Sequence, residues 1–479
     1  MKHAKKLASL LLALVMVLSL ATTAFAAGET GSITINDAVV GQTYTIYRIL
    51  DLESYNAAAY AYSYKATTAW NTFINSDAIK GTYVEVDAQG YVTWKDGADA
   101  AAFAKAAQKY AKDNSIANQG NVTANTTTVS FTGLDLGYYL VDTTLGTLCS
   151  LDTTNPDVTM KEKNKAPTND KTVEEDSTCN YGSVNDADIG QTVNFKSTIT
   201  LPKGSEKVVF HDTMSNGLTL DTTSIKVYTD AAMTTELAAG NYIVTTTGLT
   251  DGCTFEVSFN QTYLDSLTTT ATVYVGYSAT VNANAVIGGE GNTNTSKVDY
   301  GDENNTTTTP DSTTTTYTWS FDVLKYGNGI ETKVLKGAEF VLLNSDKSKV
   351  ATIVDGKLTG WVDVPEDGTW PENSVLTTDK DGKIEIAGLD ADTYYLRETK
   401  APAGYNLLAA DTEVMIAPTA SEDGKTLTLA PVTSKINNQS GTELPFTGGM
   451  GTTIFYVVGS ILLIGAAVLL ITKKRMATK

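Results

Sequence analysis

The segment Thr-Val-Asn-Phe-Lys-Ser-Thr-Ile-Thr-Leu at residues 192–201 decides the fold class of this chain. The apolar side chains on one face of its strict alternation are Val193, Phe195, Ile199 and Leu201. Because successive side chains of a β-strand point to opposite faces, this alternation predicts a strand with one buried face. The same alternation recurs at Val273, Val275 and Tyr277. We therefore expect a domain built from half-buried strands.

The composition extends this expectation to the rest of the chain. Threonine, tyrosine and valine are abundant, and they favour half-buried pleated surfaces. Residues 83–86 and 91–94 flank a Gly-containing turn and predict a hairpin. Phe103, Ala107 and Tyr110 recur at helical spacing and predict one short amphipathic helix. The predicted fold class is all-β, with one short helix in the first domain.

The two ends of the chain mark it for export. Lysines precede the apolar stretch 7–20, and Ala24-Phe25-Ala26 fits a small-residue cleavage site, so residues 1–26 are a predicted secretory signal peptide. The apolar run 454–471 is about long enough to cross a bilayer as a C-terminal transmembrane helix. The basic cluster 473–475 keeps that end in the cytoplasm.

A pentapeptide, Leu444-Pro445-Phe446-Thr447-Gly448, lies just outside this predicted membrane segment. It resembles the LPxTG sorting signal of Gram-positive surface proteins. The resemblance implies that a sortase cleaves between Thr447 and Gly448 and passes the Thr447 carbonyl to an amine. The alternative is an ordinary tail anchor with a chance pentapeptide, which the order and spacing of the motifs disfavour. We expect residues 441–479 to form a cell-wall sorting signal.

The charge and the rare residues exclude several kinds of function. The formal charge of −19 argues against nucleic acid as a partner and indicates a solvated surface. Three cysteines are too few for a disulfide scaffold. Cys179 and Cys253 could pair, or remain as buried free thiols. The chain has two histidines, and His3 leaves with the signal peptide. With His211 alone remaining, most histidine-based metal sites and catalytic triads are excluded. We expect no metal and no cofactor.

About 420 mature residues suit two to four domains. The expected segments are 27–164, 165–303, a Thr-rich exposed linker or loop at 304–316, and 317–440. Gly-Leu-Asp precedes Tyr-Tyr-Leu twice, at residues 133–140 and 388–396. This internal echo indicates similar β-sandwich modules in series.

In the third segment a lysine, a carboxyl and an amide share core-facing positions. Lys325 follows apolar residues on one strand face, Glu398 shares a face with Leu396, and Asn438 lies near the end of the segment. A lysine on an apolar face must be neutralised, paired or consumed, because burying its charge is costly. Asn437 falls on the opposite face and is the weaker candidate.

Residues 394–405 resemble the YxLxETxAPxGY box of collagen-adhesin B-type domains. The resemblance implies an intramolecular isopeptide bond between Lys325 and Asn438. Burial would let Lys325 attack as a free amine. Glu398 would act as the catalytic acid, protonated and hydrogen-bonded to the Asn438 carbonyl, and ammonia would leave. The alternative is a buried ion pair of Lys325 with Glu398.

The second segment carries a related set. Lys171 lies near its start, Asp212 follows apolar residues on a strand face, and Asn294 alternates with core-facing positions near the end. This set resembles the second type of fimbrial isopeptide domain, in which the acid is an early aspartate. The resemblance implies a bond between Lys171 and Asn294 with Asp212 as the catalytic residue. Asn292 has the same parity as Asn294 and stays open as an acceptor.

The first segment departs from this pattern. No lysine occurs between Ala27 and Tyr64, so its opening strands offer no amine. In the repeated pattern Asp142 occupies the position that corresponds to Glu398, but the first segment has no early lysine for it to act on. We expect no isopeptide bond of this kind in the first segment.

Lys161-Glu162-Lys163-Asn164 lies between the first two segments, ahead of Pro167. Its place resembles the pilin motif of backbone pilins, a YPKN-like sequence whose lysine attacks the sortase acyl-enzyme. Here Lys-Glu replaces Tyr-Pro. Lys163 is the expected acceptor, with Lys161 and Lys165 as rivals, and a charged interdomain linker is the alternative.

The whole mature chain thus resembles a major (backbone) pilin of Gram-positive bacteria. The resemblance implies tandem immunoglobulin-like β-sandwiches and a structural role, in which sortase joins Thr447 of one subunit to Lys163 of the next. The implied partners are pilus-class and housekeeping sortases, further copies of the chain, accessory pilins, peptidoglycan, and host glycans or matrix proteins. The protein would be secreted and wall-anchored after a membrane-tethered precursor stage.

The resemblance also implies that the chain is not a turnover enzyme, because each isopeptide bond forms once. A wall-anchored adhesin that never polymerises is the alternative. A secreted wall enzyme is disfavoured by the near absence of histidine and of any nucleophile constellation.

Overall fold

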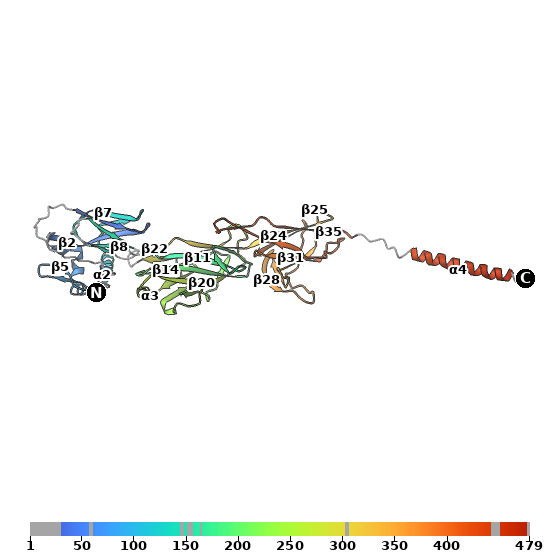
Figure 1. Cartoon of the computed structure of the whole chain (residues 1–479), viewed down its shortest axis with the longest axis horizontal. Coiled ribbons are helices and arrows are strands. Elements are labelled where there is room, and N and C mark those ends of the chain that lie inside the picture. The colour runs from blue at the N-terminus through green and yellow to red at the C-terminus, as the bar shows by residue number, and fades with distance from the viewer. Residues whose placement is uncertain are drawn as a thin grey trace, which may run out of the picture. The chain divides into compact units, whose positions relative to one another are not determined.

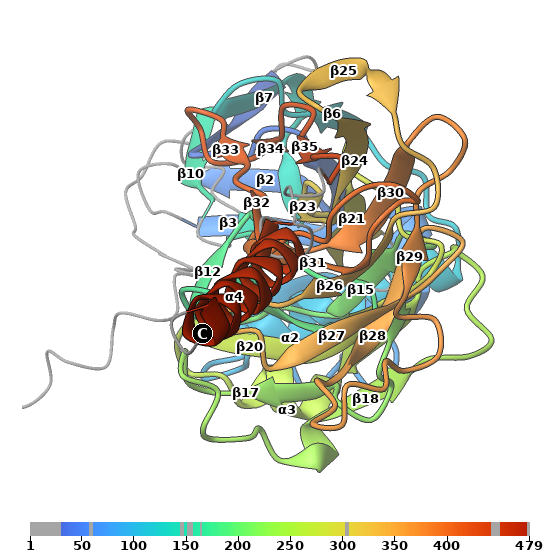
Figure 2. The ribbon, with the colours of Figure 1, turned by 90° about the vertical axis from the view of Figure 1, so that its right-hand side faces the viewer.

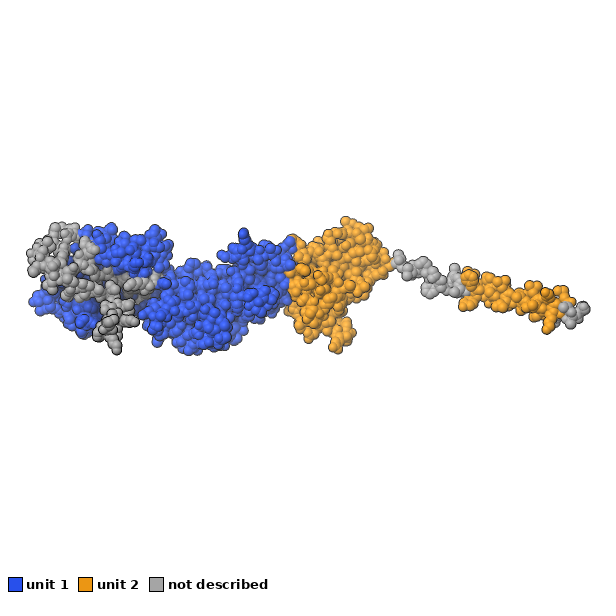
Figure 3. Space-filling view, viewed as in Figure 1, with its two compact units in different colours: residues 1–320, 387–391, 417–430 blue, residues 321–386, 392–416, 431–479 orange. Residues whose placement is uncertain are grey.

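The computed structural model describes residues 30–56, 61–143, 148–150, 157–162, 165–301, 306–441 and 451–476. It forms two compact units (Figure 3), with residues 1–320, 387–391 and 417–430 in unit 1 and residues 321–386, 392–416 and 431–479 in unit 2. Strands dominate the described parts, which confirms the all-β prediction. The predicted signal peptide at 1–26, the acceptor Lys163 and the pentapeptide at 444–448 lie outside the described residues.

The N-terminal part of unit 1 contains two sheets. Their strands are β1 (Thr30–Asn36), β2 (Thr43–Asn56), β3 (Ala61–Ala66), β4 (Val84–Val86), β5 (Tyr91–Trp94), β6 (Gly120–Thr123), β7 (Thr128–Asp135), β8 (Gly137–Thr143), β9 (Leu148–Ser150) and β10 (Asp157–Lys161). The smaller sheet has the order β10-β1-β7, and the larger has the order β4-β5-β3-β2-β8-β9 with β6 beside β2. Because Ile35 of β1 and Ile46 of β2 belong to one buried cluster, the two sheets pack against each other.

The Ala-rich stretch forms α2 (Ala100–Asp113), as predicted. The Asp99 side chain caps its first turn by accepting hydrogen bonds from two backbone N–H groups at 2.9 and 3.1 Å. Phe103 carries the buried face of α2 into the core of the larger sheet. The short turns η1 (Thr68–Trp70) and α1 (Asn71–Ile74) precede the helix. The predicted hairpin is also present, since β4 pairs antiparallel with β5.

The following part of unit 1 is a two-sheet sandwich. Its elements are β11 (Thr168–Glu175), β12 (Asn180–Gly182), β13 (Val184–Asp186), β14 (Thr192–Leu201), β15 (Val209–Met214), β16 (Leu218–Leu220), β17 (Lys226–Tyr228), η2 (Ala239–Asn241), β18 (Tyr242–Thr245), β19 (Phe255–Phe259), α3 (Gln261–Ser266), β20 (Ala271–Val281), β21 (Asn292–Gly301), β22 (Thr306–Thr308) and β23 (Ser312–Tyr317). One sheet has the order β12-β11-β14-β20-β16 with β17 beside β20, and the other has the order β13-β23-β21-β15-β19-β18 with β22 beside β21. Phe195 and Phe210, one from each sheet, share a single buried core.

The alternating segment 192–201 is strand β14, which lies in the middle of its sheet. It pairs antiparallel with β20, so that Phe195 lies opposite Tyr277 and Ile199 opposite Val273. Figure 1 shows β11, β14 and β20 running side by side. The two alternating patterns are therefore direct neighbours, and their apolar faces form one wall of the core.

The Thr-rich run differs from its interpretation as an exposed linker or loop. Residues 306–308 and 312–317 are strands β22 and β23, and β23 pairs with β13 and β21. Thr314 and Thr316 are each 1% exposed. The physical reason is that β-branched threonine fits a pleated surface well, and its polarity does not prevent burial when its hydroxyl or backbone is hydrogen-bonded.

A ten-stranded sheet comes from residues 319–438. Its strands are β24 (Trp319–Gly327), β25 (Ile330–Val334), β26 (Glu339–Leu343), β27 (Lys349–Val354), β28 (Lys357–Asp363), β29 (Leu376–Thr377), β30 (Lys383–Leu389), β31 (Thr393–Lys400), β32 (Thr412–Met415) and β35 (Thr433–Asn438). Their order is β25-β24-β30-β28-β27-β26-β31-β32, with β35 beside β24 and β29 beside β26. Figure 2 shows the hairpin partners β27 and β28. A separate two-stranded sheet joins β33 (Thr419–Ala420) to β34 (Leu427–Thr428).

The chain continues into the helix α4 (Gly451–Met476). Residues 454–474 of this helix have a mean hydropathy of 2.7, are not buried by other parts of the chain and are long enough to cross a bilayer. This helix coincides with the predicted transmembrane segment.

Candidate isopeptide-bond sites

Strand β24 places Lys325 inside the core of unit 2. The alternation along β24 buries Phe321, Val323 and Lys325 in succession, and the Lys325 side chain has no exposed surface. Burial removes water from the ammonium and lowers the pKa of Lys325, an effect that the Glu398 carboxyl opposes. The lysine is therefore biased toward the free amine, the form that can act as a nucleophile.

Two polar partners and one ring surround the Lys325 nitrogen. Nζ donates a hydrogen bond to Oδ1 of Asn438 and lies 3.0 Å from Oε1 of Glu398. The centroid of the Phe340 ring is 5.2 Å away. The structure thus brings the three residues expected from the sequence into mutual contact in a dry pocket.

Glu398 faces the amide nitrogen of Asn438. Its Oε1 and Oε2 accept hydrogen bonds from Nδ2 of Asn438 at 2.9 and 3.0 Å, and the backbone N–H of Leu408 donates to Oε2 at 2.9 Å. The sequence predicts a contact of Glu398 with the Asn438 carbonyl instead. The difference arises because the carbonyl oxygen is already occupied by Lys325. Glu398 therefore bridges the amine of Lys325 and the amide nitrogen of Asn438.

The register of two terminal strands explains this meeting. β24 and β35 run parallel, with Lys325 opposite Ile436 and Gly327 opposite Asn438. Asn438 is completely buried, whereas Asn437 points the other way and its Oδ1 accepts a hydrogen bond from the Gly329 N–H at 2.8 Å. The parity of the strand thus separates the two asparagines that the sequence left as candidates.

The second set lies between the two sheets of the sandwich in unit 1. Lys171 of β11 and Tyr277 of β20 come from one sheet, and Asp212 of β15 and Asn294 of β21 come from the other. Nζ of Lys171 donates hydrogen bonds to Asp212 and to the Tyr277 hydroxyl, and that hydroxyl also donates to Asp212. A bond between Lys171 and Asn294 would therefore tie the two sheets together across the core.

Burial dominates the electrostatics of this set. It lowers the pKa of Lys171 against the opposing effect of Asp212, and it raises the pKa of Asp212 against the opposing effect of Lys171. Burial also raises the pKa of Tyr277 well above 10. Because both members of the lysine–aspartate pair are pushed toward their neutral forms, the site favours a free amine beside a protonated acid.

Asn294 has an unsatisfied carbonyl in this site. Its Nδ2 donates to the Tyr277 hydroxyl at 3.3 Å, while its Oδ1 and the Oδ1 of Asp212 are buried and have no hydrogen-bond partner among the described residues. Buried acceptors without a donor are costly, and a proton on Asp212 would turn one of them into a donor. Asn292 is held by the backbone of Val286 through its Oδ1 and Nδ2. Asn294, which shares the Tyr277 hydroxyl with Lys171, is therefore the better candidate of the two.

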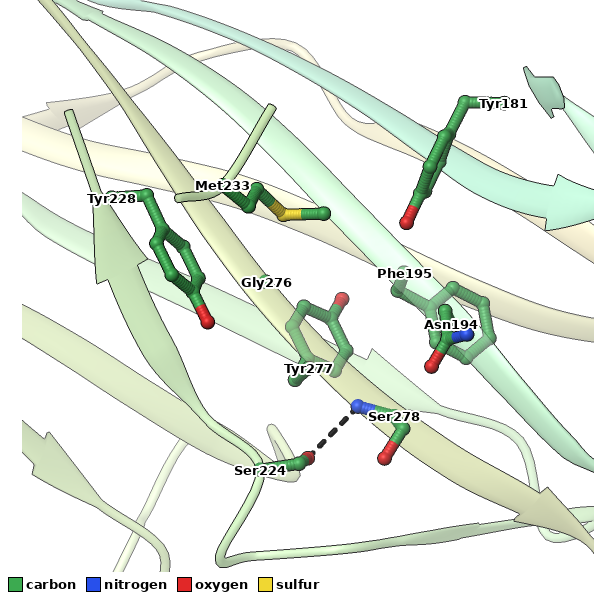
Figure 4. Close-up of a pocket in the computed structure, with 9 residues that line it drawn as sticks. All are labelled: Tyr181, Asn194, Phe195, Ser224, Tyr228, Met233, Gly276, Tyr277 and Ser278. Atoms are coloured by element: carbon green, nitrogen blue, oxygen red, sulfur yellow. Dashed lines mark hydrogen bonds between the residues drawn. The ribbon is translucent and has the colours of Figure 1, made fainter. Parts of the chain in front are cut away.

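The sequence predicts Tyr277 only as a core residue. Its ring stacks on Phe195 at 5.5 Å, and Figure 4 shows both rings among the residues that line a pocket on this sheet. The sequence did contain one indication of a further role: a tyrosine among otherwise aliphatic core positions. A buried hydroxyl needs a polar partner, so its presence indicates a polar group nearby in the core. Here that partner is the lysine–aspartate pair.

The remaining candidates lie apart from these sites. Asp142 of the N-terminal part is buried and accepts a hydrogen bond from Gln108 at 2.5 Å. Lys161 lies 3.3 Å from Asp37 with its side chain 69% exposed, and Lys165 is exposed. Cys179 and Cys253 carry free thiols and do not pair.

Three family models match different parts of the chain. Residues 189–304 match the Gram-positive pilin backbone subunit 2, Cna-B-like domain, and residues 320–430 match the SpaA prealbumin-like fold domain. Residues 436–477 match the LPXTG cell wall anchor motif. The matched ranges contain Lys325, Glu398 and Asn294, and the anchor match contains the pentapeptide at 444–448.

Two curated proteins are similar to the chain, and the similar solved structures include a backbone pilin. The trypsin-resistant surface T6 protein of Streptococcus pyogenes serotype M6 is 24% identical over 368 residues, which cover 60% of this chain and 65% of that protein. Fimbrial subunit type 1 of Actinomyces viscosus is 38% identical over 86 residues, which cover 18% of this chain and 16% of that protein. The chain thus spans less than two thirds of either relative.

One of these solved structures is the T6 backbone pilin of serotype M6 Streptococcus pyogenes, described as modular and three-domain. The two structures align with a TM-score of 0.55 and 17% sequence identity. The alignment covers 87% of this chain and 94% of the T6 pilin chain. At this identity the likeness is one of fold. The matches confirm the resemblance to Gram-positive backbone pilins, and the anchor match supports a cell wall-anchored surface location.

Proposed function

We propose that this chain is the backbone subunit of a covalently polymerised, cell wall-anchored pilus, with one intramolecular isopeptide bond in each of two domains. The observation that carries the proposal is the buried contact of Lys325 with Asn438 and Glu398. It supports the bond over a simple ion pair, because an ion pair has no need of a buried amide held against both of its members.

The chemistry at this site balances without a cofactor. The lone pair of Lys325 Nζ attacks Cγ of Asn438, and the proton that the amine gives up passes to the Glu398 carboxyl. The bond from Cγ to Nδ2 then breaks, and Glu398 returns a proton to the leaving nitrogen, which departs as ammonia. Its contact with both nitrogens suits Glu398 to this transfer.

The second bond is proposed between Lys171 and Asn294, with Asp212 as the catalytic acid. A proton on Asp212 would polarise the Asn294 carbonyl, whose oxygen lacks another donor. The same loss of ammonia follows. We propose domains at 27–164, 165–303 and 317–440, with strand β23 of the Thr-rich run 304–316 completing the second domain.

Assembly would use the two ends of each subunit. Sortase would cleave the signal at 444–448 after Thr447 and transfer the Thr447 carbonyl to Lys163 of the next subunit. Donor and acceptor are different surfaces of the same chain, so the contact is head-to-tail and builds a filament rather than a closed ring. Pilus-class and housekeeping sortases, accessory pilins and peptidoglycan are the partners that this assembly implies.

A denaturing gel of cell-wall extracts tests the proposal. Covalent polymers give a ladder of very large species that resist detergent and boiling, and a Thr447→Ala variant abolishes both the ladder and wall attachment. A single wall-linked species without a ladder would instead identify a surface adhesin that does not polymerise.

A further inference from the structure

Four side chains with metal-binding atoms meet at one end of β15 and β19, on the side opposite the isopeptide site. They are His211, Asp251, Cys253 and Glu256, and one ligand atom from each lies within 4.8 Å of the others. We propose that these residues form a site for Zn²⁺ or a closely similar divalent transition metal. Nothing in the proposed pilus function requires this site.

The strand register assembles half of it. β15 pairs antiparallel with β19, with His211 directly opposite Glu256, so both side chains project from the same sheet face. The alternation that sends Asp212 into the core sends His211 to that outer face. The other two residues come from the connection that leads into β19.

This connection folds back toward β15. Gly252 has a φ of +82°, a conformation that favours glycine, and Oδ1 of Asp251 accepts a hydrogen bond from the Cys253 N–H at 3.2 Å. The Thr254 N–H donates to the backbone carbonyl of Asp212 at 2.6 Å. These bonds hold Asp251 and Cys253 beside the imidazole of His211.

His211 is the independent sign of a ligand. The residue is 8% exposed, and neither ring nitrogen has a hydrogen-bond partner among the described residues. Nδ1 points at the cluster, 2.9 Å from Oδ2 of Asp251 and 3.4 Å from Oε1 of Glu256. A buried imidazole whose nitrogens make no aligned hydrogen bond is costly, and a metal on Nδ1 would remove that cost.

The other ring nitrogen completes a recognisable metal-site arrangement. Nε2 of His211 lies 3.3 Å from Oδ2 of Asp299 on the neighbouring strand β21. Metal-bound histidines usually donate their second ring N–H to a carboxylate, which fixes the tautomer and orients the ring. Asp299 is placed for that role while the four cluster residues face the ion.

The donor set selects the metal. One imidazole nitrogen, one thiol sulfur and two carboxylate oxygens suit Zn²⁺, whereas Ca²⁺ and Mg²⁺ prefer oxygen alone. Tetrahedral Zn²⁺ with bonds of about 2.0–2.3 Å separates its ligand atoms by about 3.3–3.8 Å. Sγ of Cys253 lies 3.8 Å from Oε1 of Glu256, so small side-chain movements would close the site.

The competing explanation is a protonated His211 held only by its carboxylate neighbours. Cys253 separates the two explanations, because only a metal site takes its sulfur as a ligand. The test is a calorimetric titration of the mature chain (residues 27–447) with Zn²⁺ under reducing conditions, together with the absorption spectrum of the Co²⁺ form. The expected result is one tight site with a sulfur-to-cobalt charge-transfer band.

Matched variants make the test specific. Cys253→Ser should abolish the charge-transfer band and weaken Zn²⁺ binding, whereas Cys179→Ser, which removes an exposed thiol of the same domain, should change neither. Asp299→Asn should weaken Zn²⁺ binding by about 10–100-fold and keep the band. Glu256→Gln keeps every thiol and provides a second ligand variant if Cys253→Ser does not fold. Absence of tight binding, or binding unchanged in both ligand variants, would overturn the proposal.

Discussion

Nζ of Lys325 lies 3.0 Å from Oε1 of Glu398, and neither side chain has any surface exposed to solvent. The same carboxyl accepts both hydrogen bonds that Nδ2 of Asn438 makes to it, at 2.9 and 3.0 Å. One acid thus touches the nitrogen that would attack and the nitrogen that would leave. This arrangement makes the site testable by chemistry as well as by stability.

The mature chain should be lighter than its sequence by the mass of two molecules of ammonia, because each proposed bond releases one. Intact mass spectrometry measures the loss, and peptide mapping locates branched peptides joining Lys325 to Asn438 and Lys171 to Asn294. Lys325→Ala and Lys171→Ala should each restore one ammonia. An unmodified mass for the wild-type chain would contradict both bonds.

Glu398→Ala should prevent the bond in the third domain. The crosslink closes a loop of 113 residues (438 − 325), and losing it should lower the free energy of unfolding by about 5 kcal/mol on the loop-closure estimate. Differential scanning calorimetry would show a lower Tm for that domain. Glu385→Ala, an exposed glutamate on β30, is the matched control and should keep both the bond and the Tm. Complete crosslinking in the Glu398→Ala variant would contradict the catalytic role assigned to Glu398.

The contrast between the two sites shows what the sequence could predict. Strand parity alone places Lys325, Glu398 and Asn438 on core faces, and the structure brings these three together. Parity also separates Asn438 from Asn437, because a shift of one residue turns a side chain to the other face. Alternation is a local property, so it can be read from neighbouring residues.

Contacts between distant strands were harder to predict. The role of Tyr277 depends on which strand faces β20 across the core, and the cluster around His211 depends on how the connection before β19 folds back. Strand β23, which carries the buried threonines, pairs with β13 more than 120 residues earlier, where Val184 lies opposite Thr315 (315 − 184 = 131). Single-sequence patterns carry little information about such long-range pairings.

Tyr277→Phe should slow formation of the second bond while preserving the fold. The substitution keeps the buried ring and removes the hydroxyl that contacts Lys171, Asp212 and Asn294. We expect a reduction in rate of about 10–100-fold, because the amine and the amide lose their shared anchor. The readout is the fraction of chains lacking the second ammonia at fixed times after synthesis.

Tyr274→Phe serves as the control for this prediction. It lies three residues earlier on β20, on the opposite face of the strand. Its rate of crosslinking should match the wild type. Equal rates for Tyr277→Phe and wild type would mean that the hydroxyl only fills the core.

Asn294→Ala should prevent the isopeptide bond and leave Lys171 and Asp212 as a buried pair without a crosslink. The contribution of this pair to the free energy of unfolding should be insensitive to pH near neutrality. The folded pair shares one proton, and the unfolded chain also holds one between the ordinary pKa values of 3.8 and 10.5. Below this window the unfolded chain binds a second proton, and above it the unfolded chain loses its only one. The contribution of the pair therefore falls on both sides of the window.

Adding Asp212→Ala to Asn294→Ala makes the stability depend on pH within this window. Burial lowers the pKa of Lys171 in the folded state, so the unfolded chain binds more protons and stability rises with pH up to about 10.5. Urea unfolding of both variants across a pH series gives the difference directly. Parallel curves for the single and double variants would contradict a lowered pKa for Lys171.

Lys163→Ala should abolish the polymer ladder and leave monomers attached to the wall. Polymerisation needs a lysine of the subunit, whereas anchoring uses an amine of the peptidoglycan precursor. Lys161→Ala and Lys165→Ala are the neighbouring controls and should preserve the ladder. If the ladder survives in Lys163→Ala, mass spectrometry of the branched Thr447 peptide will identify the lysine used, and a lysine far from residues 161–165 would refute the assigned motif.

The parallel pairing of β24 with β35 also sets an order of events in time. Lys325 is near the start of its sheet and Asn438 is in the last strand, so their site is complete only when the chain has emerged almost as far as Thr447. The set around Lys171 is complete at Asn294, well over a hundred residues earlier in synthesis and export (438 − 294 = 144). A chain emerging from the N-terminus can therefore lock its second domain while its third is still unfinished. In the proposed assembly, sortase would act a few residues beyond Asn438, after the final strand has become available.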